Sequence, residues 1–292
     1  MNIFYSNITY TCNSNCIFCY SHNTIHSGQI HNEISPQEFI NYLIQNNLSS
    51  NDRVIINGGE PFLHSEIINI LYSLKTFNCE VLIYTNGRCL KDFDFDFITE
   101  KYRFVIPVHG YEKLHDEITR CSGSFMSMKE GLEHLSHFKC NVDIKVILNN
   151  QMISSDYEFE KTIQAIDSLS FDTSLHITKM ADTIVSKRNR VPSIENDYAS
   201  IYTKKLFDYY KNRGYVIKVF DTGVKDLDIR NYIDTELPIM VHFKDNKSEW
   251  DLELKTPEMI CRQDCPKAVY CLSAVGNYTV LEYNGKFYKG LE

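Results

Sequence analysis

The first 180 residues alternate short apolar strands with amphipathic helices, and this repeat limits the possible folds more than any other feature. Such repeats form parallel sheets, because each helix carries the chain back to start the next strand in the same direction. The predicted strands are residues 3–10, 53–57, 80–85, 103–109, 142–148 and 174–178. These six βα-type units predict an α/β protein.

Helix-start signals support this interpretation. Ser35 is a suitable N-cap, Pro36 suits the first helical position and Glu38 completes a capping box, which predicts a helix over 36–48. Ser155 and Glu158 repeat the capping pattern after the fifth strand. Further helices are predicted over residues 64–76, 124–138 and 197–213.

The rhythm of strands and helices breaks after residue 180, which divides the chain into three parts. Residues 1–180 form the predicted core, and residues 181–256 form a linker, a helix and short strands. Residues 257–292 are rich in cysteine and include a hairpin of 278–283 and 286–289 about an Asn-Gly turn. The sequence therefore predicts a small C-terminal α+β extension.

The charge and hydropathy of the chain exclude several classes of protein. The net charge of −8 makes nucleic acid an improbable partner, since binding its backbone requires clustered Lys and Arg. No apolar run approaches the ~20 residues that cross a bilayer. The N-terminus lacks the basic start and apolar block of a signal peptide. We expect a cytoplasmic protein without a membrane partner.

Three of the ten cysteines lie close together directly after the first strand. Cys12, Cys16 and Cys19 form a C-x3-C-x2-C loop, and thiolates are the ligands that iron–sulfur clusters prefer. Three ligands for four irons leave one iron open to a small molecule. A three-cysteine zinc site and buried thiols are the alternatives, although structural zinc usually takes four protein ligands.

The cysteine loop, with the aromatic Phe18 before its last cysteine, resembles the signature of the radical S-adenosylmethionine (SAM) superfamily. Gly58-Gly59-Glu60-Pro61 after the second strand is similar to the GGEP segment of that family. Thr85-Asn86-Gly87 after the third strand is similar to its TNG segment. The resemblance implies that Gly58, Gly59, Glu60, Pro61 and Asn86 bind SAM, with Glu60 accepting from the methionine amino group.

Two further segments extend the resemblance. Residues 105–120 are similar to the strand-four segment of the family, in which His115 and Asp116 fit the pattern and His109 replaces a common aspartate. His109 is expected to face SAM. Asn149, at the end of the fifth strand, is expected to reach the SAM ribose or carboxylate.

The resemblance covers residues 1 to about 180 and implies a partial (β/α)6 barrel of the TIM type. It also implies the cofactors, a [4Fe-4S] cluster that binds SAM and SAM itself, together with an electron donor of the flavodoxin or ferredoxin type. The implied chemistry is one-electron cleavage of SAM to a 5′-deoxyadenosyl radical, which abstracts hydrogen from a substrate. No residue is assigned as a catalytic acid or base.

A second group of cysteines lies near the C-terminus, where Cys261, Cys265 and Cys271 are spaced C-x3-C-x5-C. The group resembles the SPASM or twitch extensions of radical SAM enzymes and implies a second [4Fe-4S] cluster. No cysteine follows the hairpin in residues 286–292, so a complete seven-cysteine SPASM domain is not expected. A zinc site and plain structural cysteines are the alternatives, and Cys121 is a candidate for a fourth ligand.

Three functions are compatible with these features. The first is a maturase that modifies a ribosomally made peptide, with a separate protein binding the leader peptide. The second is a radical SAM enzyme acting on a small metabolite or nucleotide bound near the second cluster. The third is a regulatory or scaffold protein that uses its cysteine sites only structurally.

Overall fold

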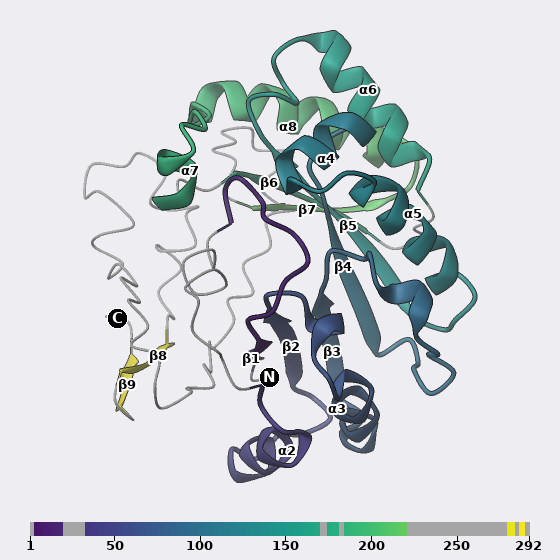
Figure 1. Ribbon diagram of the computed structural model, residues 1–292, viewed down its shortest axis with the longest axis vertical. Coiled ribbons are helices and arrows are strands. Elements are labelled where there is room, and N and C mark those ends of the chain that lie inside the picture. The colour runs from purple at the N-terminus through teal and green to yellow at the C-terminus, as the bar shows by residue number, and fades with distance from the viewer. Residues whose placement is uncertain are drawn as a thin grey trace.

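A computed structural model describes residues 3–19, 33–169, 174–180, 184–220, 279–283 and 286–289 of the chain. Among these residues, seven strands form one parallel sheet in the order of the chain (Figure 1). The strands are β1 (Ile3–Thr9), β2 (Arg53–Gly58), β3 (Glu80–Tyr84), β4 (Tyr102–Val108), β5 (Asn141–Leu148), β6 (Ser174–Lys179) and β7 (Val216–Phe220). The predicted α/β class and the partial barrel agree with this sheet.

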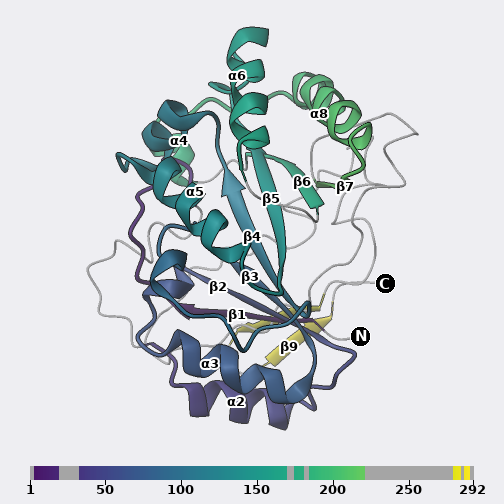
Figure 2. The ribbon, with the colours of Figure 1, turned by 90° about the vertical axis from the view of Figure 1, so that its right-hand side faces the viewer.

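Helices connect the strands and cover one face of the sheet (Figure 2). They are α2 (Pro36–Gln45), α3 (Ile67–Leu74), α4 (Glu112–Thr119), α5 (Ser124–Leu135), α6 (Asp156–Asp167), α7 (Ile184–Arg188) and α8 (Asn196–Lys211). Short 3-10 turns lie at Pro61–Leu63, Lys75–Phe77 and Leu90–Asp92. The sequence did not predict α4 and α7, which are only eight and five residues long.

The predicted capping box before α2 is present. The Ser35 hydroxyl accepts from the Glu38 backbone N–H, and the Glu38 carboxylate accepts from the Ser35 N–H. These bonds satisfy donors that the first helical turn leaves unpaired. No helix of the described residues has the length and apolar character needed to cross a membrane.

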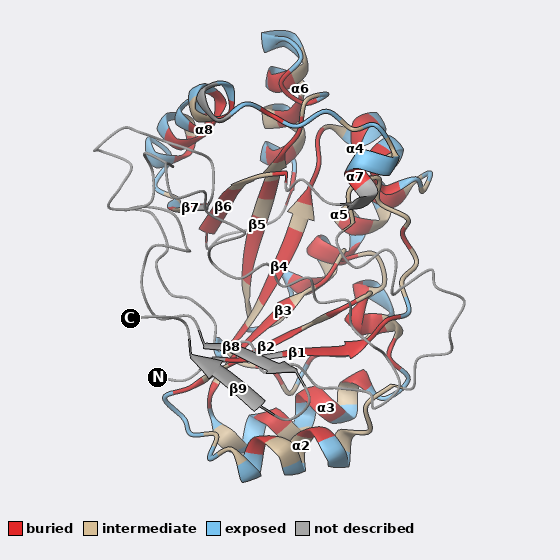
Figure 3. Ribbon diagram, turned by 90° about the vertical axis from the view of Figure 1, so that its left-hand side faces the viewer, coloured by how far each residue is buried: buried red, intermediate tan, exposed pale blue. Residues whose placement is uncertain are grey.

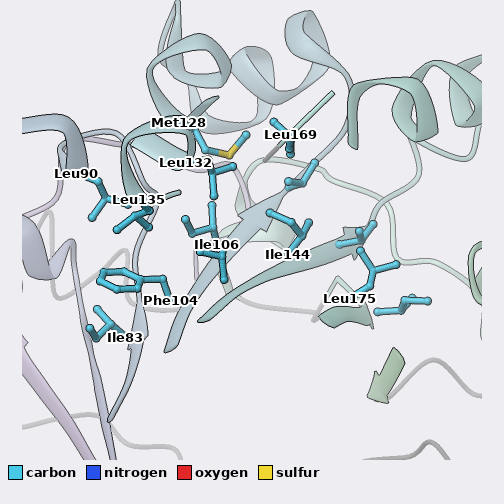
Figure 4. Close-up of a cluster of buried hydrophobic side chains, with 14 of the residues drawn as sticks. Ile83, Leu90, Phe104, Ile106, Met128, Leu132, Leu135, Ile144, Leu169 and Leu175 are labelled. Atoms are coloured by element: carbon cyan, nitrogen blue, oxygen red, sulfur yellow. The ribbon is translucent and has the colours of Figure 1, made fainter. Parts of the chain in front are cut away.

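The main hydrophobic core lies between the sheet and its helices. Alternate residues of each strand point to the helix side, so the strand residues of the core come from one face (Figure 4). Ile106 and Ile144 of neighbouring strands face Met128 and Leu132 of α5 in this way. Figure 3 shows that the strands of the sheet are largely buried.

The opposite face of the sheet carries a row of charged side chains near the N-terminal ends of the strands. Arg53 Nη2 lies 2.7 Å from Glu80 Oε2, and Arg103 Nη1 lies 2.7 Å from Asp143 Oδ1. His176 Nε2 lies 2.9 Å from the second oxygen of Asp143. The predicted site residues lie in loops at the opposite, C-terminal ends of the strands, where active sites of βα barrels form.

The parallel sheet continues beyond the sixth predicted strand. β7 pairs with β6 in parallel, with His176 opposite Lys218, and α8 packs on both strands. The predicted C-terminal hairpin is confirmed, because β8 (Thr279–Tyr283) and β9 (Lys286–Lys289) pair antiparallel. Its turn residues lie outside the described part of the chain.

Candidate functional site

The glycine pair that ends β2 lies directly against the chain entering the cysteine loop. Gly59 N donates to Thr9 O and Glu60 N donates to Thr11 O, both at 2.8 Å. A β-carbon on Gly58 would lie 2.2 Å from Thr9 O, and one on Gly59 would lie 2.2 Å from Thr11 O. Both positions therefore require glycine. At both glycines, the backbone at the end of β2 comes close to the backbone that leads into the cysteine loop.

Glu60 is buried and joins the ends of β2 and β3. Its Oε1 accepts from Phe62 N at 3.1 Å and from the Thr85 hydroxyl at 2.6 Å. Its Oε2 accepts from Asn86 N at 2.7 Å. Burial raises the pKa of this carboxyl, and the three hydrogen bonds act in the opposite direction. The expected contact of Glu60 with the SAM amino group stays a prediction.

The loop after β3 holds the cysteine loop from one side. Asn86 Nδ2 donates to Asn13 Oδ1 at 2.7 Å, and Asn13 Nδ2 donates to Cys89 Sγ at 3.3 Å. Arg88 Nη1 donates to Asn13 O at 2.6 Å and to Ser14 Oγ at 3.2 Å. The sequence predicts a role for Asn86 but did not point to Asn13 or Arg88. The only local signal for Arg88 was its place directly after Thr85-Asn86-Gly87.

Helix α4 and a side chain following α7 hold the cysteine loop from another side. Asn15 N donates to Thr119 O and Ile17 N donates to Ile118 O, both at 3.0 Å. Asn189 Nδ2 donates to Ile17 O at 2.7 Å. Backbone bonds of this kind fix the path of the loop between its first and last cysteines.

The three thiols of the loop lie within electrostatic reach of one another. Burial raises the pKa of Cys12 to about 11, and it raises that of Cys16 as well. The negative charge of Cys19 raises both further. Iron binds thiolates, so its binding at this loop must displace protons.

The cysteine loop provides the kind of ligands that an iron–sulfur cluster takes. Among the described residues, no three His, Cys, Asp or Glu side chains are arranged to hold a single metal ion. The three half-buried thiols on one braced loop fit a cluster bound from one side.

His109, at the end of β4, lies directly against the cysteine loop. Its ring centroid is 5.1 Å from that of Phe18, in an edge-on contact, and 5.1 Å from that of His115, in a stacked contact. Within the described residues, Nδ1 of the buried His109 ring has no hydrogen-bond partner. Burial lowers the pKa of His109 well below its usual value, so a neutral imidazole adjoins the loop. Its expected contact with SAM stays a prediction.

Asn149 is buried beside His109. Its Nδ2 donates to His109 O at 2.7 Å, and its Oδ1 accepts from Met152 N at 2.9 Å. Asn149 thereby shapes the turn after β5, and its expected contact with the SAM ribose or carboxylate stays a prediction. Pro61, the last residue of the predicted glycine segment, is buried and starts a 3-10 turn.

The aspartate of the strand-four segment has a structural role. Asp116 accepts from Gly123 N at 2.6 Å and from Phe125 N and the Ser124 hydroxyl at 2.9 Å. A carboxylate at this position satisfies free N–H groups at the start of α5. The match of Asp116 to the family pattern is therefore explained by the connection between α4 and α5.

Acid is expected to destabilise the iron-free protein through buried histidines. Burial lowers the pKa of His115 to about 3, and the nearby Arg88 acts in the same direction. The unfolded chain takes up a proton near pH 6.5 and the folded chain does not, so stability falls as the pH falls below that value. Between pH 7 and pH 5 the loss from His115 is about 2 kcal/mol.

Urea unfolding of the iron-free wild type and of His115→Phe at both pH values measures this loss. The variant should lose about 2 kcal/mol less than the wild type over the same range. An equal loss in the two proteins would show that His115 is not held neutral by the fold.

The remaining predicted ligands are not placed. Cys261, Cys265 and Cys271 lie outside the residues that the structure describes. Cys121 is half-buried at the end of α4, where its N–H donates to Asp116 O at 3.1 Å. The role of Cys121 as a fourth ligand of a second cluster stays a prediction.

Comparison with protein families finds a match over residues 6–166, and the family is the Radical SAM superfamily. A Methanocaldococcus jannaschii protein named as a glycyl-radical enzyme activating enzyme is 26% identical over 162 residues. The match covers 53% of this chain and 59% of that protein. The chain thus spans less than two thirds of the length of this relative.

Solved structures with a similar fold include two enzymes with bound SAM. One is anSMEcpe, with a TM-score of 0.55 and 14% identity over 75% of this chain and 63% of that chain. Another is SuiB of Streptococcus suis, with a TM-score of 0.58 and 13% identity over 94% of this chain and 71% of that chain. SuiB has also been solved bound to its precursor peptide SuiA, with a TM-score of 0.58 and 12% identity.

Proposed function

The chain belongs to the radical SAM superfamily, and from this premise we propose that it is a maturase that modifies a ribosomally made peptide. Enzymes of this superfamily use a [4Fe-4S] cluster and SAM. The observation that carries the proposal is the likeness in fold to SuiB over 94% of this chain, since SuiB binds a precursor peptide. The predicted SPASM-like tail also supports a peptide substrate.

Each part of the site has a proposed task. Cys12, Cys16 and Cys19 would hold the cluster, which with SAM supplies a 5′-deoxyadenosyl radical. The chain's own residues brace the cysteine loop, enclose it and present polar groups to the cofactor. The residues proposed to contact SAM are Gly58, Gly59, Glu60, Pro61, Asn86, His109 and Asn149.

Two partners complete the proposal. An electron donor of the flavodoxin or ferredoxin type would reduce the cluster. A separate protein would bind the leader peptide and deliver it to the barrel.

A second [4Fe-4S] cluster on Cys261, Cys265 and Cys271 is part of the proposed enzyme. Replacing all three cysteines by alanine should lower the iron content after anaerobic reconstitution by about four atoms per chain. Iron analysis of the wild type and the triple variant measures this loss. Unchanged iron would exclude a second cluster at these residues.

The test of peptide modification uses the reconstituted, reduced protein with SAM and the short peptide encoded nearest to its gene. The expected result is formation of 5′-deoxyadenosine together with a changed peptide mass. A peptide carrying deuterium should transfer the label to 5′-deoxyadenosine, because the radical takes its hydrogen from the substrate. Cleavage of SAM driven by a small metabolite, with the peptide unchanged, would favour the alternative of a metabolite or nucleotide substrate.

A second candidate function is activation of a glycyl-radical enzyme. The similarity to the M. jannaschii protein, 26% over 162 residues, favours it. In this case the hydrogen would come from a backbone glycine of a partner enzyme. An electron paramagnetic resonance (EPR) doublet of a glycyl radical on that partner, with no change in peptide mass, would establish this function instead.

A further inference from the structure

Arg88 brings a positive charge to the segment between the first two cysteines of the loop. It follows the turn after β3, and its Nη1 donates to Asn13 O at 2.6 Å and to Ser14 Oγ at 3.2 Å. Both acceptors lie between Cys12 and Cys16. The Arg88 guanidinium therefore contacts the loop from the end of β3, although Arg88 lies 74 residues after Ser14 in the sequence.

The position of Arg88 is fixed by its neighbours. Asn86 Oδ1 accepts from Arg88 N at 3.1 Å, and Asn86 Nδ2 donates to Asn13 Oδ1 at 2.7 Å. The same asparagine thus holds both the arginine backbone and the residue that the arginine contacts. Arg88 Nε is buried and has no hydrogen-bond partner within the described residues, so part of its donor capacity is unused there.

The charge of Arg88 lies beside the cysteine ligands along the chain. Asn13 directly follows Cys12, and Ser14 lies two residues before Cys16. The guanidinium that donates to both therefore holds its positive charge against the segment that joins these two ligands.

We propose that Arg88 is a positioning residue that sets the reduction potential of the [4Fe-4S] cluster held by Cys12, Cys16 and Cys19. The proposal rests on the cofactor of the superfamily and does not depend on the identity of the substrate. Three thiolates give the site an excess of negative charge, and reduction adds one more electron. A nearby cation stabilises the reduced form more than the oxidised form, which raises the potential.

The test compares Arg88→Gln, which removes the charge, with Arg88→Lys, which retains it without the planar fork. Arg213→Gln is the matched control, because it removes the same charge from an exposed arginine in contact with Tyr209. Each substitution is made in the chain that lacks Cys261, Cys265 and Cys271, so that the EPR signal comes from the cluster at Cys12, Cys16 and Cys19. Titration of each reconstituted protein with a chemical reductant then gives the midpoint potential of that cluster. The iron content is measured in parallel.

The proposal predicts a lower midpoint potential in Arg88→Gln and potentials near that of the wild type in Arg88→Lys and Arg213→Gln. If Arg88→Gln does not take up iron while Arg88→Lys does, the requirement for the charge is also supported. Equal potentials in the wild type and Arg88→Gln would overturn the proposal. So would an equal shift in Arg88→Gln and Arg88→Lys, because the fork geometry, not the charge, would then be responsible.

Discussion

Replacing Cys16 with alanine is expected to abolish SAM cleavage and to remove the iron that the loop holds. Cys16 lies between the other two thiols in the sequence, and its N-terminal and C-terminal neighbours are fixed by backbone bonds to α4. Two remaining thiolates cannot hold a four-iron cluster as three do, so the source of the radical is lost.

Production of 5′-deoxyadenosine by the reconstituted, reduced variant measures this effect. The expected yield is at the level of a reaction without enzyme. Cys140→Ala is the matched control, because this half-buried thiol lies at the start of β5 and its Sγ contacts Leu135 O. A Cys16→Ala protein that still cleaves SAM as the wild type does would remove Cys16 from the cluster site.

Replacing Gly59 with alanine is expected to lower the stability of the protein strongly. The added carbon would lie 2.2 Å from Thr11 O, 2.7 Å from Thr11 C and 2.8 Å from Tyr10 O. These are backbone atoms, which cannot turn aside as a flexible side chain can. Separating β2 from the cysteine loop should cost about 3 kcal/mol of unfolding free energy and should impair iron loading.

Urea unfolding of the iron-free protein and iron analysis after reconstitution measure the two effects of Gly59→Ala. Gly123→Ala is the control, because its added carbon meets no atom within 4 Å. Its φ of +76° still makes alanine unfavourable, at a cost of about 1 kcal/mol, with iron loading retained. Equal stability of Gly59→Ala and the wild type would show that the loop does not depend on this close contact.

The sequence predicted the sheet well because the relevant signals are local. Apolar runs bounded by turn residues placed the first six strands to within one residue at each end. Ser35 and Glu38 placed the start of α2 because both ends of a capping box lie within one helical turn. Helix α4 was missed, since eight residues carry too little periodicity. β7 was expected among the short strands of residues 181–256, but its place in the main sheet was not, because no clear repeat surrounds it.

The sequence predicts the separate motifs of the candidate site but not the hydrogen bonds that join them. The cysteines and the glycine pair are visible in short motifs, and the fold brings them together. The bonds from Arg88 to Asn13 and from Asn189 to Ile17 join residues 75 and 172 positions apart. Such contacts depend on how the ends of the strands pack in the folded protein, which a local sequence pattern does not show.

The most direct test of the account is EPR spectroscopy of the variant that lacks Cys261, Cys265 and Cys271. After anaerobic reconstitution, Cys12, Cys16 and Cys19 should retain about four irons per chain. Reduction should give the signal of a [4Fe-4S] cluster, and added SAM should change that signal because one iron is open to it. A variant that holds no iron, or a cluster signal that SAM leaves unchanged, would contradict the account.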